Sequence, residues 1–426
     1  MYSEVFLLVT AASTALALAA IRLGMPAALA STASTLLYFL MYGGTADLGV
    51  LPYIGAVQAS LDIWKAPFVA TASILGVLVT VYAPRYLKHL GADRWYYAVH
   101  ALYVLSFDLI VLFENLVMVF LALELSIITS FLLIWYFGYG NRRRIGLLYF
   151  IWAQIGSVSF LVGVAYSGHF EAYAFEAAGA ASFLVLLGLL IKMGTAGVHF
   201  WLPYAHAEAP TPLSALLSPV HVGLMSYWIW RLEAGAGWPA EALYLYGLAT
   251  AVYGSLLVFR EADIKRALAD STIANMGLLL AAASIGGNLG FLATALLFMG
   301  HAFAKAAGFM LSGIYITEKG VRDIDRLGPT RPLFAAGSMA FIALAGVFGV
   351  NLLGKALVAV GVPHAASAVV LLVLALFSTA LYSFYLLHRI YKSGEAGPEA
   401  HLDMLLPTLA AAAAPYVLLV LGLLWL

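Results

Sequence analysis

Long apolar runs dominate this chain and limit what it can fold into. A scan for stretches of about 20 apolar residues, the length that crosses a bilayer as a helix, finds about fourteen. Only 10% of the residues are charged, against about 25% in soluble domains. The sequence therefore predicts an all-α, polytopic membrane protein with about 14 transmembrane helices. Their expected centres lie near residues 13, 33, 75, 104, 126, 156, 190, 222, 250, 279, 301, 346, 378 and 415.

Basic residues are concentrated in every second connection between the expected spans. The connections are numbered in chain order, so that connection 1 follows the first span. Of the 21 lysines and arginines, only Lys65 and Arg231 fall in even-numbered connections, and sixteen fall in odd ones. Because basic residues favour cytoplasmic connections, we expect the odd connections in the cytoplasm and both termini outside a cell membrane. The sixteen are Arg22, Arg85, Lys88, Arg94, Arg142, Arg143, Arg144, Arg260, Lys265, Arg266, Lys319, Arg322, Arg326, Arg331, Arg389 and Lys392.

Several function classes are excluded. The chain has no cysteine, which rules out thiol catalysis, cysteine-ligated clusters and disulfides. No cofactor site is recognisable, and the first apolar run lacks the basic start of a cleaved signal. The basic residues are spread along connections rather than gathered on one nucleic-acid-binding face. The longest polar connectors span residues 43–65 and 391–403, so no soluble domain is expected.

Charged groups within the expected spans are the candidate functional residues. Lys192, Lys305 and Lys355 each cost roughly 3 kcal/mol at the bilayer centre on insertion scales. Glu124, with apolar residues on both sides, is the best candidate for an anionic partner. Such groups indicate function by default, and the alternative for Glu124 is half of a static ion pair. Asp108 is a weaker candidate.

The stretch from Leu187 to Leu232 is expected to be the centre of an ion path. An apolar helix carrying Lys192 breaks at glycines and prolines, and a second apolar helix carries His221. Irregular backbone at membrane depth survives only inside protein or beside a water-filled cavity. His199 would share a face with Lys192 if the first helix continued. His221 titrates in a range that suits proton exchange, although either histidine is alternatively an ordinary interfacial or core residue.

The second half of the chain repeats this pattern. His301 and Lys305 are four residues apart and so share one helix face, which favours a neutral histidine beside the lysine. Lys355 lies in a second interrupted apolar stretch, residues 334–362, five spans after the first. Paired interrupted segments are typical of inverted repeats in transporters. Because five is an odd number of membrane crossings, the second repeat begins on the opposite side of the membrane and has the opposite orientation.

Several runs resemble the antiporter-like, proton-translocating membrane subunits of respiratory complex I, membrane-bound hydrogenases and multi-subunit cation/proton antiporters. The clearest are GVHFWLPYAHAEAPTPLSALLS at 197–218, DIKRALADSTIANMG at 263–277 and HAFAKAAGFMLSG at 301–313. The glutamate in ENLVMVFLALEL, the run VRDIDRLG and the later Gly354–Lys355 pair also fit. Together the matches span most of residues 100–360.

The resemblance implies a fold and a pathway. The fold has N-terminal helices in 1–94, inverted five-helix repeats in 95–232 and 240–392, and a last helix in 404–426, with helices 7 and 12 broken. The family's helix-five glutamate falls on Glu124, its helix-seven lysine on Lys192 and its helix-twelve lysine or acid on Lys355. Lys305 and His301 would belong to the same hydrated axis.

The chain departs from the family pattern at three points. The family often has a lysine in its eighth helix where this chain has Gly223, so His221 would have to substitute. Tyr204 stands where the family usually has an aspartate, so a carboxylate on the uptake side is lost. The chain stops at its fourteenth expected span, and the lateral helical arm of the longest members is therefore not expected.

The sequence leaves three functions open. We predict a non-redox, proton-translocating subunit of a redox-driven complex of the NADH/quinone oxidoreductase or hydrogenase kind. It would move protons along Glu124, Lys192, His221, Lys305 and Lys355, with His199 and His301 secondary, without a cofactor and beside other membrane subunits. The same axis would serve a multi-subunit Na⁺/H⁺ antiporter. A structural subunit that moves no protons is the third alternative.

Overall fold

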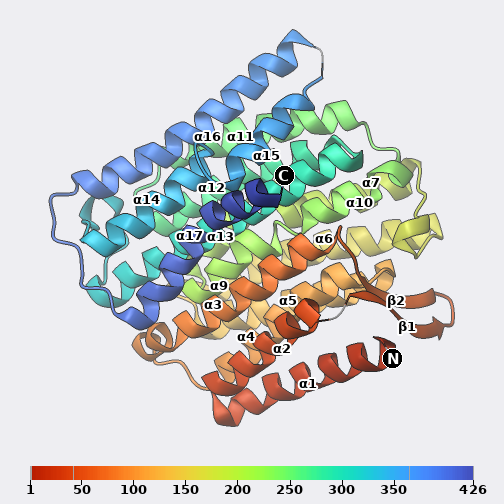
Figure 1. The fold of residues 1–426 in the computed structure, drawn as a ribbon, viewed down its shortest axis with the longest axis horizontal. Coiled ribbons are helices and arrows are strands. Elements are labelled where there is room, and N and C mark those ends of the chain that lie inside the picture. Colours follow the sequence, from red (N-terminus) through yellow and green to blue (C-terminus); the bar gives the residue numbers. More distant parts are fainter. Residues whose placement is uncertain (1, 42, 364, 426) are drawn as a thin grey trace.

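The protein is a bundle of helices that run mostly along one direction (Figure 1). The computed structural model describes residues 2–41, 43–363 and 365–425. The helices of the first half are α1 (Tyr2–Leu23), α2 (Met25–Met41), α3 (Ala66–Leu90), α4 (Trp95–Leu112), α5 (Leu116–Phe137), α6 (Arg142–Ser167) and α7 (Gly179–Met193). Those of the second half are α11 (Ala240–Val258), α12 (Ile264–Ser284), α13 (Gly287–Lys319), α14 (Arg331–Ala345), α15 (Val350–Val360), α16 (Ala366–Lys392) and α17 (Leu402–Trp425).

Between the two halves the chain is broken into short helices. After α7 it forms α8 (Leu202–Glu208), α9 (Thr211–Leu216), a π-helical turn η2 (Leu217–His221) and α10 (Met225–Ala236). Short 3₁₀ turns η1 (Ala172–Ala174) and η3 (Ile324–Arg326) lie in two connections. Helix α7 ends because Gly194 adopts φ +69°, a left-handed conformation that glycine adopts readily.

The all-α, polytopic membrane class expected from the sequence is confirmed. Among the described residues, eleven helical segments are long and apolar enough to cross a membrane, with α14 and α15 forming one of them. Three other expected spans are shorter helices, because α2 has 17 residues, α7 has 15 and α10 has 12. Helices α12 and α13 form the centre, whereas α1, α6 and α16 lie at the periphery and expose apolar side chains.

Much of the polar connector 43–65 forms an antiparallel hairpin. Strand β1 (Gly44–Leu51) pairs with β2 (Gly55–Leu61). The hairpin is fastened to the bundle by Asn115, whose side-chain amide donates to the carbonyls of Ile54 and Ala56 at 2.7 and 3.0 Å. We call this the hairpin end of the molecule, at the right of Figure 1.

The opposite end carries most of the basic residues, and we call it the basic end. Ion pairs join its connections, including Arg85 with Glu318 at 2.8 Å and Arg322 with Asp263 at 2.6 Å. Lys319 also pairs with Glu395 at 2.8 Å. These contacts place odd-numbered connections side by side, at the left of Figure 1. The basic residues of the odd-numbered connections thus gather at one end of the bundle, and the hairpin lies at the other.

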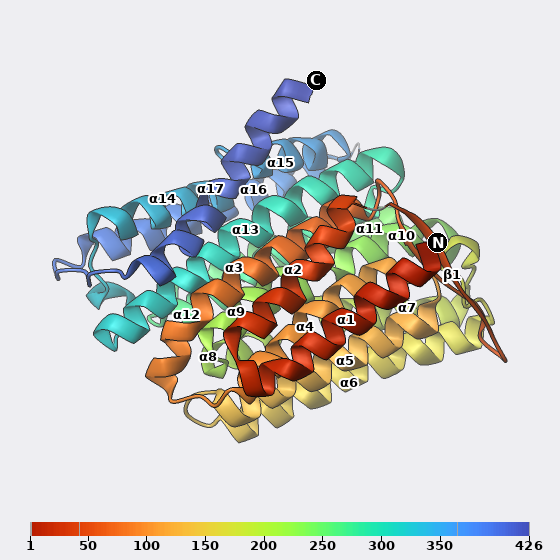
Figure 2. The same cartoon turned by 60° about the horizontal axis from the view of Figure 1, so that its bottom comes forward.

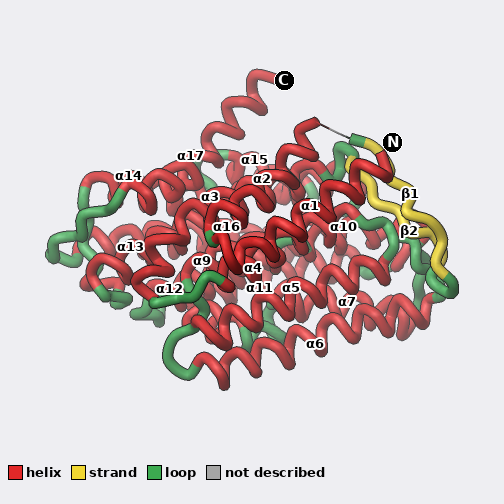
Figure 3. Tube along the Cα trace, turned by 90° about the horizontal axis from the view of Figure 1, so that it is seen from below, coloured by secondary structure: helices red, strands yellow, loops and turns green. Residues whose placement is uncertain are grey.

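Helices α6 and α7 pack closely enough for small residues to be required. A Cβ atom at Gly188 would lie 2.5 Å from the Gly156 carbonyl oxygen, and one at Gly156 would lie 3.1 Å from Lys192 Cγ. Close backbone approach between membrane helices depends on such small residues. Figures 2 and 3 show α6 and α7 running together along one side of the bundle. This packing brings the Lys192 side chain against α6.

Candidate functional site

Glu124 lies on α5 and is bound by two side chains of α6. The Gln154 amide donates to one carboxylate oxygen at 2.6 Å, and the Ser157 hydroxyl donates to the other in a short hydrogen bond. The carboxylate is only partly buried. Two neutral donors hold this carboxylate in place and stabilise its charge.

Lys192 is buried in the last turn of α7, with 2% of its surface exposed. Its ammonium donates to the Ala153 carbonyl of α6 at 3.5 Å. Glu124 does not approach within 4 Å, so the direct Glu124–Lys192 ion pair that the sequence suggested is not formed. Both groups contact α6 instead, Glu124 through Gln154 and Ser157, and Lys192 through Ala153. They remain within range of a direct electrostatic interaction.

His221 ends the π-helical turn η2 and is 2% exposed. Its Nδ1 shares a 3.1 Å hydrogen bond with the Tyr103 hydroxyl of α4, and Lys192 is within electrostatic range. Turns of π-helix often mark functional sites in helices. In the same turn, the Ser218 hydroxyl bonds Thr272 of α12 at 2.6 Å, which joins η2 to the centre of the second half.

Lys305 and His301 lie one turn apart on α13, and both are buried. The Lys305 ammonium donates to the Leu268 carbonyl at 2.8 Å and to the Ser271 hydroxyl in a short hydrogen bond, both on α12. Neither ring nitrogen of His301 has a hydrogen-bond partner among the described residues. The Lys305 ammonium is thus held by a carbonyl and a hydroxyl, and the buried His301 ring lies one helical turn away.

Lys355 reaches back to the break between α14 and α15. Its ammonium donates to the last carbonyls of α14, those of Leu344 at 3.2 Å and Ala345 at 2.7 Å, and to the Thr379 hydroxyl of α16 at 2.9 Å. Free carbonyls at a helix C-terminus carry a partial negative charge. Half-helix ends of this kind bind cations in membrane transporters, so the break supplies the buried ammonium with acceptors.

Gly346 makes room for this lysine, and replacing it gives a first prediction. An added Cβ would lie 2.4 Å from Lys355 Cδ, at a backbone φ of +72°. We expect Gly346→Ala to displace the ammonium from the α14 carbonyls and to lower the thermal unfolding temperature of the detergent-solubilised protein. Gly320→Ala is the matched control, because Gly320 has φ +67° but nothing within 4 Å of its Cβ position. If both variants lower the unfolding temperature equally, the destabilisation comes from placing alanine in a left-handed backbone conformation, which costs about 1–2 kcal/mol, and not from displacing Lys355.

A polar seam connects these groups in the second half. Asn275 of α12 donates to the Ser271 carbonyl and to the Tyr382 hydroxyl, both at 2.7 Å. Tyr382 lies on α16 one turn from Thr379, which accepts from Lys355. Hydroxyl, amide and carbonyl groups therefore run from the Lys305 site to the Lys355 site. No carboxylate lies within 4 Å of Lys192, Lys305 or Lys355 in the described part of the chain.

His199 does not lie on this seam. The sequence aligned it with Lys192 on one continued helix, but α7 ends at Met193 and the chain turns away. The His199 Nε2 instead shares a 3.1 Å hydrogen bond with the Tyr253 hydroxyl of α11. Both residues line a cavity of about 170 Å³ near the basic end.

Sequence reasoning missed two buried groups near the basic end. Lys265 was counted among the topology-setting bases, yet it is fully buried and donates to the Ala209 carbonyl. His206, which follows Pro203 in the connection after α7, is also fully buried, and neither of its ring nitrogens has a partner in the described residues. Lys265 and Arg266 are adjacent in sequence and point about 100° apart on a helix. Nothing local to the sequence says which of the two faces inward.

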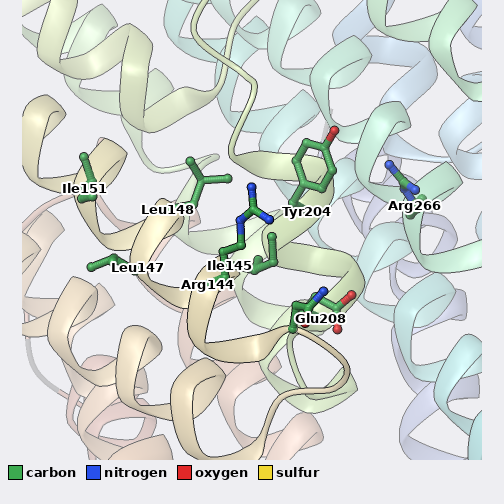
Figure 4. A pocket seen from close by; sticks show the side chains of 9 residues that line it. Arg144, Ile145, Leu147, Leu148, Ile151, Tyr204, Glu208 and Arg266 are labelled. Carbon is green, nitrogen blue, oxygen red and sulfur yellow. The ribbon is translucent and has the colours of Figure 1, made fainter.

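A larger cavity of about 650 Å³ opens beside α6 and α8 (Figure 4). Arg144, Glu208, Tyr204 and Arg266 form its polar part, and apolar residues of α6 including Leu147 line the rest. The Arg266 guanidinium lies 5.4 Å from the centre of the Tyr204 ring. This cation–π contact separates the larger cavity from the one beside His199, because both residues line both cavities.

The hairpin end holds a buried ion cluster. Lys65 pairs with Glu114 at 2.8 Å, and Arg231 lies 3.7 Å from the same carboxylate. Burial lowers the pKa of Lys65, and the charge of Glu114 opposes this. Burial also acts to raise the pKa of Glu114, but the charges of Lys65 and Arg231 and the hydrogen bonds from Lys65 and Ser60 together outweigh it, so the pKa of Glu114 lies below its ordinary value. The two basic residues of even-numbered connections thus meet at one acid.

Residues 114–382 match the family described as "NADH:quinone oxidoreductase/Mrp antiporter, TM". A probable K(+)/H(+) antiporter subunit of Rhizobium meliloti is 34% identical over 308 residues, 67% of this chain and 30% of that protein. An NAD(P)H-quinone oxidoreductase chain 4 of Trichormus variabilis is 28% identical over 327 residues, 69% of this chain and 60% of that protein.

The fold matches a solved structure over its whole length. A chain of the membrane-bound sulfane sulfur reductase, an archaeal respiratory membrane complex, superposes with a TM-score of 0.86 at 22% identity. The match covers 99% of this chain and 96% of that one. This chain spans only 30% and 60% of the two sequence relatives above. On the family match over residues 114–382, the chain belongs to the membrane-subunit family of NADH:quinone oxidoreductases and Mrp antiporters.

Proposed function

We propose that this chain translocates protons as one subunit of a multi-subunit, redox-driven membrane complex. The path runs through Glu124, Lys192, His221, Lys305 and Lys355, with His301 beside it. One observation carries the proposal. The three buried lysines are held by carbonyls and hydroxyls, with no carboxylate within 4 Å among the described residues. A static ion pair would lock a lysine in its charged form, whereas neutral acceptors also tolerate the neutral amine.

The arrangement supports transfer in steps. A lysine held by neutral groups can release and regain a proton without leaving an opposite charge uncompensated in a low-dielectric interior. Glu124 can modulate the proton affinity of Lys192 through space. The serine, threonine and tyrosine hydroxyls of the seam both donate and accept hydrogen bonds. They can therefore relay protons between the lysine sites.

The topology of the proposal is that of two inverted repeats. We propose fourteen spans, with repeats in residues 95–232 and 240–392, flanked by 1–94 and 404–426. The broken segments after α7 and between α14 and α15 would be corresponding elements, each beside one lysine. The positive-inside rule supports a cytoplasmic basic end and an outer hairpin end, with both termini outside.

The test is to purify the chain from its native membrane in mild detergent and to identify its companions by mass spectrometry. We expect iron–sulfur subunits to co-purify, because the chain itself offers no recognisable redox centre and needs a partner to supply the driving force. Recovery of only small membrane proteins would contradict the redox assignment and would support the alternative below.

The second candidate is a component of a cation/proton antiporter without redox chemistry. The observation that favours it is the 34% identity to a probable K(+)/H(+) antiporter subunit. The same buried axis would serve, with Na⁺ or K⁺ moving in exchange for protons. Cation-dependent proton movement in proteoliposomes, in the absence of any electron donor, would identify this activity. A structural subunit that moves no protons would be indicated if variants of the axis lysines left transport by the complex unchanged.

A further inference from the structure

Besides Glu124, the acid of the predicted pathway, Asp270 is a buried carboxylate. It lines the small cavity at the basic end. The cavity of about 170 Å³ is lined by His199, Tyr204, Tyr253, Arg260, Glu261 and Asp270, among others. Arg260 and Glu261 belong to the connection between α11 and α12, so the cavity reaches the surface of that end. Its volume holds several water molecules.

Asp270 is the more buried of the two acids that line this cavity, the other being Glu261. It is the seventh residue of α12, about 9 Å along the axis from the first residue of that helix. Only 4% of its surface is exposed. Within the described residues no hydrogen-bond donor and no cation within 4 Å contacts its carboxylate. A buried carboxylate without a protein partner needs water or a proton, and the cavity provides the water.

The same turn of α12 holds the Lys305 ammonium. Lys305 donates to the Leu268 carbonyl and to the hydroxyl of Ser271, the residue that follows Asp270. Asp270 and Lys305 act on each other electrostatically, yet they form no ion pair within 4 Å. A proton would pass between them through water or through the Ser271 hydroxyl.

We propose that Asp270 is the proton-uptake carboxylate of the Lys305 site. Tyr204, where the resemblance implies an aspartate in most family members, lines the same cavity. In each cycle the Asp270 carboxylate takes a proton from cavity water and passes it to the neutral Lys305 amine, and the carboxylate is thereby restored. This inference rests on the proposed proton pathway.

The surrounding charges are compatible with this role. Arg260 and Arg266 favour an anionic Asp270, whereas Glu261 opposes it. Glu261 lies 3.6 Å from Arg266, so its charge is largely balanced at the cavity mouth. His199 is the remaining titratable group that lines the cavity beside the two tyrosines. Of the two carboxylates that line the cavity, Asp270 is therefore the buried one and the one that acts electrostatically on Lys305.

The experiment uses the whole complex in proteoliposomes, energised by its electron donor or by a K⁺ gradient, whichever drives the wild-type complex. We expect Asp270→Asn to lower the initial rate of proton translocation at least tenfold, because a positioned acid–base group typically contributes about 10²–10⁴-fold. Asp270→Glu should retain most of the rate. Tyr204→Asp combined with Asp270→Asn should recover much of it, because the carboxylate returns to the same cavity.

Glu261→Gln is the matched control, because it removes a carboxylate from the cavity mouth and should leave the rate near wild type. A loss in Glu261→Gln equal to that in Asp270→Asn would overturn the assignment, since cavity charge rather than Asp270 would then matter. A second readout is the protonated-carboxyl band in infrared pH-difference spectra of the complex. We expect Asp270→Asn to remove one component of this band, and an unchanged spectrum would contradict the proposal.

Two patterns of failure are distinguishable. If Lys305→Ala abolishes translocation while Asp270→Asn is normal, the pathway stands and the uptake role of Asp270 is wrong. If both variants translocate normally, the proposed function itself fails. Rescue by Tyr204→Asp has no explanation in a purely structural role for Asp270, because the two side chains come from different helices.

Discussion

Replacing Lys192 by alanine should reduce proton translocation by the whole complex at least tenfold while leaving the complex assembled. The ammonium lies between Glu124 and His221 in the proposed path and is 2% exposed, so bulk water cannot readily replace it. Because no carboxylate of the described residues lies within 4 Å of Lys192, its removal breaks no direct ion pair among them. Translocation is measured in proteoliposomes with a pH-sensitive dye, and assembly by native gel and subunit mass spectrometry.

The control for this variant is Lys88→Ala, which removes an exposed lysine near the end of α3 and should leave the rate unchanged. Glu124→Gln provides the companion measurement, because it keeps a hydrogen-bonding side chain opposite Gln154 and Ser157 but removes the charge. We expect Glu124→Gln to lower the rate of proton translocation as well. Normal translocation by both Lys192→Ala and Glu124→Gln would remove this half of the axis from the mechanism.

Replacing Lys65 by methionine should destabilise the protein by about 3 kcal/mol, the lower end of the range for breaking a buried ion pair. Lys65 is 1% exposed and Glu114 12%, so the variant leaves a largely buried carboxylate whose remaining charged neighbour within 4 Å, among the described residues, is Arg231 at 3.7 Å. The Leu112 carbonyl and the Ser60 hydroxyl each lose the hydrogen bond that they accept from Lys65 at 2.9 Å, although the Ser60 hydroxyl still donates to Glu114 at 2.6 Å. The measurement is denaturant or thermal unfolding in detergent.

The double variant Lys65→Met with Glu114→Gln should recover part of this stability, because an uncompensated charge costs more than a missing pair. No recovery in the double variant would show that packing, not charge, accounts for the loss. Lowering the pH should also destabilise the folded protein. The folded-state pKa of Glu114 is depressed, so its stabilisation is complete above the unfolded-state value of about 4.3. It is lost as the pH falls through the lower folded-state value.

Much of the candidate site could be predicted from the sequence because charge within a membrane span is rare and visible. Lys192, Lys305 and Lys355 stand out from apolar neighbours, and all three are buried. The acceptors of these lysines were not predictable. Ser271, Thr379 and the carbonyls of α14 are ordinary groups in a sequence, and only packing between helices selects them.

Other residues show where local reasoning fails. His199 was placed with Lys192 by helical periodicity, but Gly194 ends that helix and sends His199 to another cavity. Lys265 and Asp270 belong to a run that reads as a connection, yet both lie in α12, the most enclosed helix. Spacing in the sequence predicts which side chains share a face only within one continuous helix, and it no longer does so after the helix ends.

The sequence by itself determined that this chain is a multi-pass helical membrane protein with charged residues in its interior. The bilayer length and the cost of charge in apolar surroundings leave few other readings. Only the tertiary structure decided which groups hold those charges and which acids stay apart from the lysines. Contacts between helices depend on rotation and close approach, and residues far apart in the chain set both.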